Sequence, residues 1–191
     1  MNDQIFETVV TTVSFDGRAH IAPMGVRYKD GQVLLLPFKP STTLDNILSG
    51  GQAVLNVVTD TRVFAGCVTG RRDWPLLPAE CVKGVRLACA LGHLELQLAS
   101  KTDHPQRPQL AMSRVHEVVH RTFTGFNRAQ AAVIEGAVLV SRLAMLEREK
   151  IDAEMAYLQI AIDKTAGPEE HEAWHWLQQA IAAHRNQPTG W

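Results

Sequence analysis

The residues best suited to chemistry in this chain are gathered in one stretch, PFKPSTTLDN at positions 37–46. Ser41, Thr42 and Thr43 open a predicted helix, and Lys39 comes just before them. Hydroxyl side chains at a helix start accept hydrogen bonds from N–H groups of the first turn. The remaining N–H groups, the helix dipole and a nearby Lys favour an anion, above all a phosphate. An ordinary capped helix explains the same residues, so the stretch alone leaves both interpretations open.

The elements around this stretch are predicted to be strands joined by tight turns. Asp16-Gly17 and Asp30-Gly31 lie between apolar runs, which is a strong hairpin signal. The pattern predicts a helix at 42–48 and strands at 5–13, 19–28, 33–36, 53–58, 85–98 and 115–124, with long loops at 71–83 and 100–108. Tight turns early and long loops late favour a Greek-key β-barrel over a parallel sheet.

The chain is predicted to become helical after Phe126, with helices at about 127–146, 149–164 and 168–183. We therefore expect an α+β, mainly β protein with a barrel domain at 1–125 and a C-terminal helical extension at 126–191. The first of these helices is apolar except for a stripe at Arg128, Glu135 and Arg142. Such a helix is either buried within the chain or packed in a dimer interface.

Three further places could contact a ligand. Pro23 lies inside a predicted strand, where Pro marks an edge or a bulge, and Gly25 would let a flat ligand approach the backbone. Asn56 lies in a buried strand, where a cofactor contact and a tie to the backbone are equally good interpretations. Asn127 is a candidate N-cap of the first long helix.

His171-Glu172-Ala173-Trp174-His175 matches the zinc-protease motif H-E-x-x-H. We interpret it as the edge of a packed helix instead, because Trp174, Leu177 and Ile181 define a buried face beside the two His residues. No metal site is therefore predicted. The sequence also contains no dinucleotide-binding, P-loop or nucleophile-elbow motif.

The composition of the chain limits which binding partners and which cellular location are expected. A net charge of −1 gives no reason to expect nucleic acid or a membrane surface as a partner. The first residues show no basic segment before an apolar run, so a secretory signal is not expected. Cys67, Cys81 and Cys89 form no C-x-x-C pair, and we expect buried, reduced thiols and a cytoplasmic location.

Three motifs resemble those of an uncharacterised archaeal and bacterial family: A-P-M-G-V at 22–26, P-F-K-P-S-x-T-x-x-N at 37–46 and G-F-N-R-A at 125–129. Its members have the split β-barrel of flavin-reductase-like and pyridoxamine-phosphate-oxidase-like proteins and bind FMN. The resemblance implies cofactor contacts at Ala22, Pro23, Met24, Gly25, Lys39, Ser41, Thr42, Thr43, Asn46, Asn56, Asn127 and Arg128. The family often has Arg where this chain has Thr42. The loss of that charge would either weaken phosphate binding or leave the phosphate to Lys39 or Arg62.

The resemblance also implies a function, while the catalytic residues stay unknown. An FMN-dependent oxidoreductase would pass hydride or electrons between FMN and a small-molecule substrate or a nicotinamide donor, NADH or NADPH. A non-catalytic FMN carrier or sensor is the alternative, and a reductase acting on a pterin in one-carbon metabolism is a weaker one. Split-barrel flavoproteins place the flavin at a two-fold interface, so a homodimer is expected.

Overall fold

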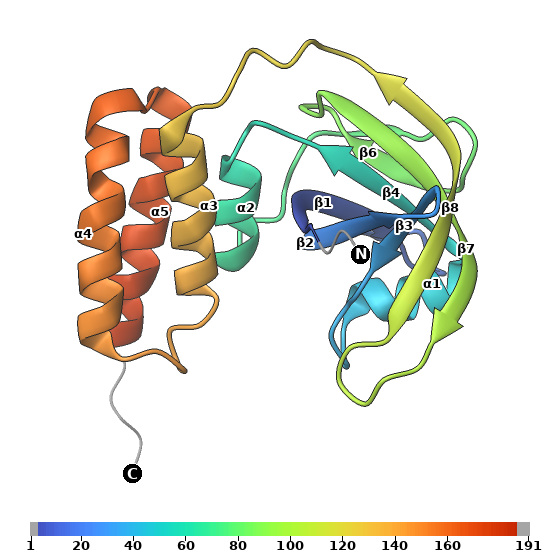
Figure 1. Cartoon of the computed structure of the whole chain (residues 1–191), viewed down its shortest axis with the longest axis horizontal. Coiled ribbons are helices and arrows are strands. Elements are labelled where there is room, and N and C mark those ends of the chain that lie inside the picture. Colours follow the sequence, from blue (N-terminus) through green and yellow to red (C-terminus); the bar gives the residue numbers. More distant parts are fainter. Residues whose placement is uncertain (1–3, 187–191) are drawn as a thin grey trace. The chain divides into compact units, whose positions relative to one another are not determined.

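The computed structural model describes residues 4–186, which fall into two compact units (Figure 1). The first unit comprises residues 4–58 and Trp74–Phe123 and consists of strands and one helix. The second comprises Thr59–Asp73 and residues 124–186 and is helical. Compared with the boundary expected at residue 125, the helical unit also takes in the segment 59–73.

Six antiparallel strands close the barrel in the order β1-β2-β3-β8-β7-β4. Their bounds are Phe6–Val13 (β1), Ala19–Lys29 (β2), Gln32–Leu35 (β3), Gln52–Val57 (β4), Gly92–Thr102 (β7) and Gln109–Val119 (β8). A separate two-stranded sheet is formed by β5 (Leu76–Pro78) and β6 (Val85–Leu87). The closed barrel with its added helices confirms the predicted fold class.

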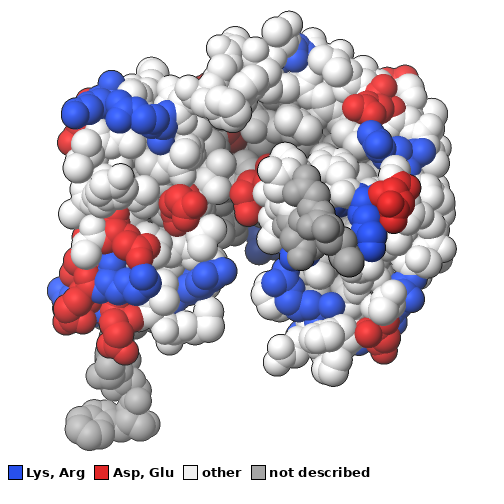
Figure 2. Space-filling model, viewed as in Figure 1, with Lys and Arg blue, Asp and Glu red and all other residues white. Residues whose placement is uncertain are grey.

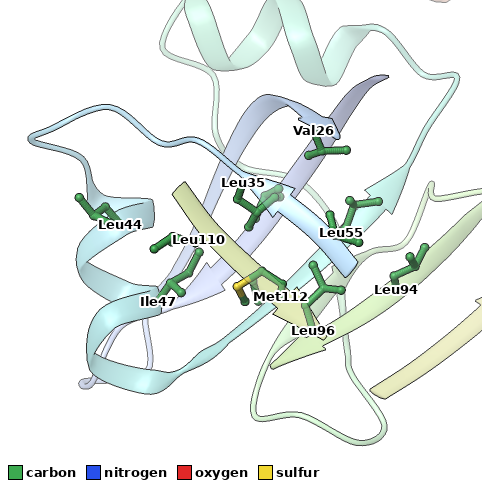
Figure 3. Close-up of a cluster of buried hydrophobic side chains, with 12 residues drawn as sticks. Val26, Leu35, Leu44, Ile47, Leu55, Leu94, Leu96, Leu110 and Met112 are labelled. Carbon is green, nitrogen blue, oxygen red and sulfur yellow. The ribbon is translucent and has the colours of Figure 1, made fainter. Parts of the chain in front are cut away.

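The barrel core is a single cluster of aliphatic side chains that point inward from all six strands (Figure 3). Helix α1 (Thr42–Gly50) adds Leu44 and Ile47 to this cluster, so its apolar face is buried against the strands. The helix ends at Gly51, which has φ 71° and whose N–H donates to the carbonyl of Ile47. A left-handed residue of this kind is a common helix stop and is best met by glycine. The short helix predicted from the sequence is thus fixed at both ends.

Two predicted strands were wrong in extent. The strand expected at 85–98 is two strands, β6 and β7, separated by a turn in which the N–H of Ala90 donates to the carbonyl of Leu87. The strand expected at 115–124 begins at Gln109 and ends at Val119. The short helix α2 (Arg62–Val68) and strand β5 were not predicted.

In the helical unit, α3 (Arg128–Val140) packs against α2, α4 (Arg148–Thr165) and α5 (Pro168–Arg185). A Cβ added at Gly136 of α3 would lie 2.9 Å from the Trp174 ring, so glycine permits the close approach of α3 and α5. Most of the apolar surface of α3 is therefore covered within the chain, whereas Ala131 is exposed and Ile134 and Val138 are half-buried. Of the two interpretations of this helix, burial is the one that the structure shows.

The cysteines and the surface add three facts. Cys67, Cys81 and Cys89 are all free thiols, but only Cys67 is buried; Cys81 is exposed and Cys89 half-buried, so the expectation of burial was wrong for these two. No helix of residues 4–186 is long and apolar enough to cross a membrane. Acidic and basic side chains are interspersed on the face shown in Figure 2.

Candidate functional site

One edge of β2 is left unpaired where the predicted ligand-contacting strand lies. The β2–β3 ladder pairs only Arg27, Tyr28 and Lys29, whereas the β1–β2 ladder extends over Ala19–Val26. Ala22–Gly25 is thus paired on the β1 side alone, and all four residues are half-buried. Pro23 has no N–H to give a ladder, so its place at such an edge meets the rule for Pro in strands. On the β3 side, the backbone of Ala22–Gly25 therefore has no ladder partner.

Residues 36–40 lead from the end of β3 to the start of α1. Ser41 is the N-cap, and its Oγ accepts a hydrogen bond from the N–H of Leu44 (3.2 Å). Within residues 4–186, no hydrogen bond is recorded to the N–H groups of Thr42 and Thr43. These donors lie at the positive end of the helix, where an anion is stabilised.

The side chains at the start of α1 do different things. Thr42 is exposed, whereas Thr43 and Asn46 are buried. The Nδ2 of Asn46 donates to the hydroxyl of Thr12 on β1 (2.9 Å), which fastens the helix to the barrel. Of these predicted contacts, only Thr42 presents its side chain to solvent.

Two cations flank the segment that leads into α1. Lys39 Nζ lies 2.6 Å from Asp103 Oδ1, and the Lys39 N–H donates to the carbonyl of Gln106. Arg107 donates to the carbonyl of Leu36 from Nε and Nη2 (3.3 and 3.1 Å), and its guanidinium lies 4.3 Å from the centre of the Phe38 ring. The polar loop at 103–108 is therefore held against residues 36–39.

The charged side chains around Asp103 carry a net positive charge. Lys101 also approaches Asp103, at 3.6 Å, so two ammonium groups share one carboxylate. The hydrogen bond from Lys39 and the charge of Lys101 lower the pKa of Asp103, which keeps it ionised. Arg107 adds a further cation beside an exposed aromatic ring. Sequence reasoning missed Arg107; its only signal was its position in a polar loop of unusual length.

Met24 and Gly25 are constrained by the barrel itself. Met24 packs partly against the aliphatic core, and its carbonyl accepts a hydrogen bond from Thr8 Oγ1 (2.9 Å). A Cβ added at Gly25 would lie 2.6 Å from Cγ2 of Ile5. The close approach that demands glycine is therefore made by Ile5 of the same chain.

Asn56 is fully engaged inside the barrel unit. Its Nδ2 donates to the carbonyl of Val9 (3.1 Å) and lies 3.2 Å from Thr11 Oγ1, while its Oδ1 accepts the N–H of Leu87 (2.8 Å). The side chain is completely buried. Of the two interpretations of Asn56, these bonds match the tie to the backbone.

The remaining predicted contacts belong to the helical unit. Asn127 caps α3, accepting the N–H of Ala129 (2.7 Å), and Arg128 is the first residue of that helix. Arg62 forms ion pairs with Asp60, Glu169 and Glu172 at 2.8–3.2 Å. Its charge is thus balanced by three carboxylates of its own unit, which argues against a phosphate as its partner.

The two His residues of the H-E-x-x-H motif lie exposed on α5, three residues before and one residue after buried Trp174 in the sequence. The Trp174 Nε1 donates to Gln159 Oε1 (2.7 Å) on α4. Trp174, Leu177 and Ile181 are all buried, which confirms the predicted packed face. No group of three or more metal-binding side chains with suitable geometry occurs in the part of the chain that the structure describes.

Comparison with known proteins places this fold in context. The solved structure of the FMN-bound protein MM1853 from Methanosarcina mazei has a TM-score of 0.79 and 20% identity, covering 94% of this chain and 96% of that one. The 2-nitrobenzoate 2-nitroreductase NbaA of Pseudomonas fluorescens has a TM-score of 0.52 and 21% identity, covering 63% and 66%. The split barrel of flavin reductases is thus the fold of the barrel unit.

Sequence comparison agrees with the structural one. The uncharacterised protein MJ1453 of Methanocaldococcus jannaschii is 27% identical over 145 residues, which is 73% of this chain and 75% of that protein. Two family models match, at residues 6–121 and 127–179: the N-terminal domain of a protein of unknown function, DUF447, and its companion DUF447 domain. Because these models span most of the sequence, the chain belongs to the DUF447 family.

Proposed function

We propose that this protein binds FMN and passes hydride or electrons between the flavin and a small substrate or a nicotinamide donor. A DUF447 protein that shares the fold over nearly its whole length is described as FMN-bound. A second protein with the same barrel is described as a nitroreductase. Both descriptions belong to those proteins, and they support the proposal for this chain through the shared fold.

The proposal rests on two backbone segments of the barrel unit that have hydrogen-bonding groups without partners in the part of the chain that the structure describes. One is the edge of β2, and the other is the start of α1. The edge of β2 at Ala22–Gly25 is not paired with β3, and the N–H groups of Thr42 and Thr43 donate to no group within the described residues. Partnerless N–H groups at a helix start suit a phosphate. An open strand edge suits the polar edge of a planar ring system.

The charges and side chains around the edge fit the same ligand. Lys39 and Arg107 supply positive charge, and Phe38 is an exposed aromatic side chain beneath the Arg107 guanidinium. Arg is well suited to phosphate because its planar group can donate two parallel hydrogen bonds. We assign Ser41, Thr42, Lys39 and Arg107 to the phosphate and Ala22–Gly25 to the ring.

The division of labour in such a site is simple. FMN, when bound, supplies the hydride or electron transfer itself, and the protein supplies position and electrostatics. The cations near α1 offset the phosphate charge, and the rigid β1–β2 ladder fixes the open edge. Asn46 contributes indirectly, because its hydrogen bond to Thr12 holds α1 at its angle to β1.

We also propose that the protein is a homodimer, although one of the two arguments from the sequence is now weaker. Most of the apolar surface of α3 is covered by α2, α4 and α5, so this helix is no longer the main argument for a second subunit. The argument that remains is the split-barrel fold. Sedimentation that gives about twice 21.1 kDa would support a homodimer, and a monomer that holds FMN would remove it.

The absorption spectrum of the purified protein tests the proposal. FMN titrated into flavin-free protein should bind stoichiometrically, and binding should quench the fluorescence of the flavin. Anaerobic addition of NADH or NADPH to the loaded protein should then bleach the flavin. Bound flavin that stays oxidised with both donors would favour the carrier or sensor, whereas the absence of FMN binding would overturn the proposal altogether.

A further inference from the structure

Three titratable side chains, Glu95 and His93 on β7 and His120 just beyond the end of β8, lie next to one another. His93 and Glu95 are completely buried. His93 Nε2 lies 3.2 Å from Glu95 Oε1, and His93 Nδ1 lies 2.9 Å from His120 Nε2. The planes of the two imidazole rings are parallel to within 5°, and the ring centroids lie 5.0 Å apart. Glu95, His93 and His120 therefore form one hydrogen-bonded chain.

Glu95 is the fixed end of this chain. Its carboxylate accepts the backbone N–H groups of Glu80, Cys81 and Val82 at 2.7, 2.6 and 2.8 Å. Burial raises the pKa of Glu95, but these three bonds and the bond from His93 outweigh burial, and its pKa is lowered. Glu95 is thus an ionised acceptor held by the loop that precedes β6.

An ionised Glu95 fixes the protons on both rings. His93 must donate to it from Nε2–H, which leaves Nδ1 of the neutral ring as an acceptor. The N–H in the second bond must then come from Nε2 of His120. Because the chain ends on backbone N–H groups, a proton that enters at His120 has no exit beyond Glu95. The arrangement therefore stores protons and does not conduct them to a reacting group.

His120, the other end of this hydrogen-bonded chain, belongs to a segment that borders a pocket. A pocket of about 410 Å³ is lined on one side by Arg121, Thr122 and Phe123. On the other side it is lined by residues at the ends of β4, β7 and β8, which include Val57, Leu91, Leu94, Val118 and Val119. His120 is the first residue after β8 and immediately precedes the part of the segment that lines this pocket.

We propose that the His93–His120 hydrogen bond is an acid-opened clasp that holds the segment His120–Phe123 beside this pocket. One added proton is tolerated, since an imidazolium and an imidazole still share a hydrogen bond, and its charge lies near Glu95. A second proton leaves two N–H groups facing each other between two cations. The rings must then separate, and the movement falls on His120 because His93 is buried within the β-ladder.

The surrounding charges set the direction of the response. Arg86 on β6, His93 on β7 and the adjacent Arg121 face His120, and Glu80 opposes them. His116 faces His93 from β8, and Glu80 lies 3.4 Å from His116 Nε2. Desolvation first, and then the cations, lower the pKa of His120, so the clasp is closed at neutral pH.

Other bonds limit how far the segment can move. The N–H groups of His120 and Arg121 both donate to the carbonyl of Leu91 (2.7 and 3.0 Å), and the Arg121 guanidinium donates to the carbonyl of Cys89. None of these bonds titrates in the acid range. Opening therefore loosens the segment without releasing it, and the amides of His120 and Arg121 report the change directly.

Residue-resolved amide hydrogen exchange from about pH 7.5 down to about pH 4, well below the ordinary His pKa so that the second proton can bind, tests the clasp. After correction for intrinsic rates, protection at His120 and Arg121 should fall about tenfold more than protection in the β1–β2 ladder, as expected for one lost hydrogen bond. In H120Q the Gln still donates to His93 but does not titrate, so the differential loss should vanish. H184Q, at an exposed position on α5, should behave like the parent.

Three results would overturn the clasp. The amides at His120 and Arg121 could follow the β1–β2 ladder at all pH values. H120Q could keep the full acid response. Nitrogen chemical shifts of the parent protein at about pH 8 could show the His93 proton on Nδ1. The last two measurements are independent, so a poorly folded H120Q would still leave the tautomer as a decisive test.

Discussion

The side-chain carbonyl of Asn56 accepts the backbone N–H of Leu87 at 2.8 Å, which joins barrel strand β4 to the β5–β6 sheet outside the barrel. Thr11 of β1 also donates to the carbonyl of Val85, so β6 is fastened at two points. Glu95 fastens the loop just before it. Polar residues on three barrel strands thus hold one covering segment in place.

The first prediction concerns this tie. Asn56→Ala should lower the free energy of unfolding by about 1–3 kcal/mol, because it leaves the buried N–H of Leu87 without an acceptor. Urea denaturation measures the change. Asn186→Ala, the same substitution at an exposed helix end, should stay within about 0.5 kcal/mol. Equal effects of the two substitutions would contradict a structural role for Asn56.

The second prediction concerns acid stability. A carboxyl group whose pKa is lowered on folding contributes stability that is full above its unfolded value, about 4.3, and is lost as pH falls through the folded value. Glu95 is such a group. The free energy of unfolding should therefore decline below about pH 4.3, and the decline should be shallower in Glu95→Gln. Glu117→Gln on β8, an exposed position, should keep the parent slope; a parent slope in Glu95→Gln would sink the idea.

The barrel was predictable because its early strands carry their own signals. Asp16-Gly17 and Asp30-Gly31 mark both hairpins, and Gly17 and Gly31 have φ of 85° and 78° as such turns require. Ser41 and Gly51 mark the ends of α1 in the same local way. The two hairpins and helix α1 were therefore predicted correctly, because the residues that determine them are adjacent in the sequence.

The errors arose where distant contacts decide. Residues 85–98 carry apolar side chains on both sides of a turn at 88–91. The structure shows this turn by the bonds from the N–H of Ala90 to the carbonyl of Leu87 and from the N–H of Leu91 to the carbonyl of Val57 on β4. Helix α2 has seven residues and depends on packing against α3 and α5. Arg107 was missed for the same reason. It joins the candidate site through a hydrogen bond to the carbonyl of Leu36, a residue far away in the sequence, and no local sequence pattern predicts this contact.

The third prediction separates packing from metal binding on α5. Trp174→Ala should cost about 3–5 kcal/mol, since it empties a buried aromatic site and frees Gln159. His171→Ala with His175→Ala should change stability by less than about 1 kcal/mol, because both positions are exposed. Thermal unfolding with and without added zinc is the measurement. One tightly held zinc per chain, lost in the double His variant, would restore the hydrolase interpretation.

The fourth prediction identifies the phosphate contacts. Arg107→Gln should weaken FMN binding by about ten- to a hundredfold, the equivalent of a charged hydrogen bond of about 1.5–3 kcal/mol. Riboflavin, which has no phosphate, should lose much less affinity, so the ratio of the two dissociation constants is the quantity to measure by fluorescence titration. Arg114→Gln is the matched control, since Arg114 pairs with Glu117 on β8 and is assigned no ligand. If Arg107→Gln weakens both flavins equally, the phosphate lies elsewhere, and Lys39→Gln in the same titration would show whether the start of α1 is involved at all.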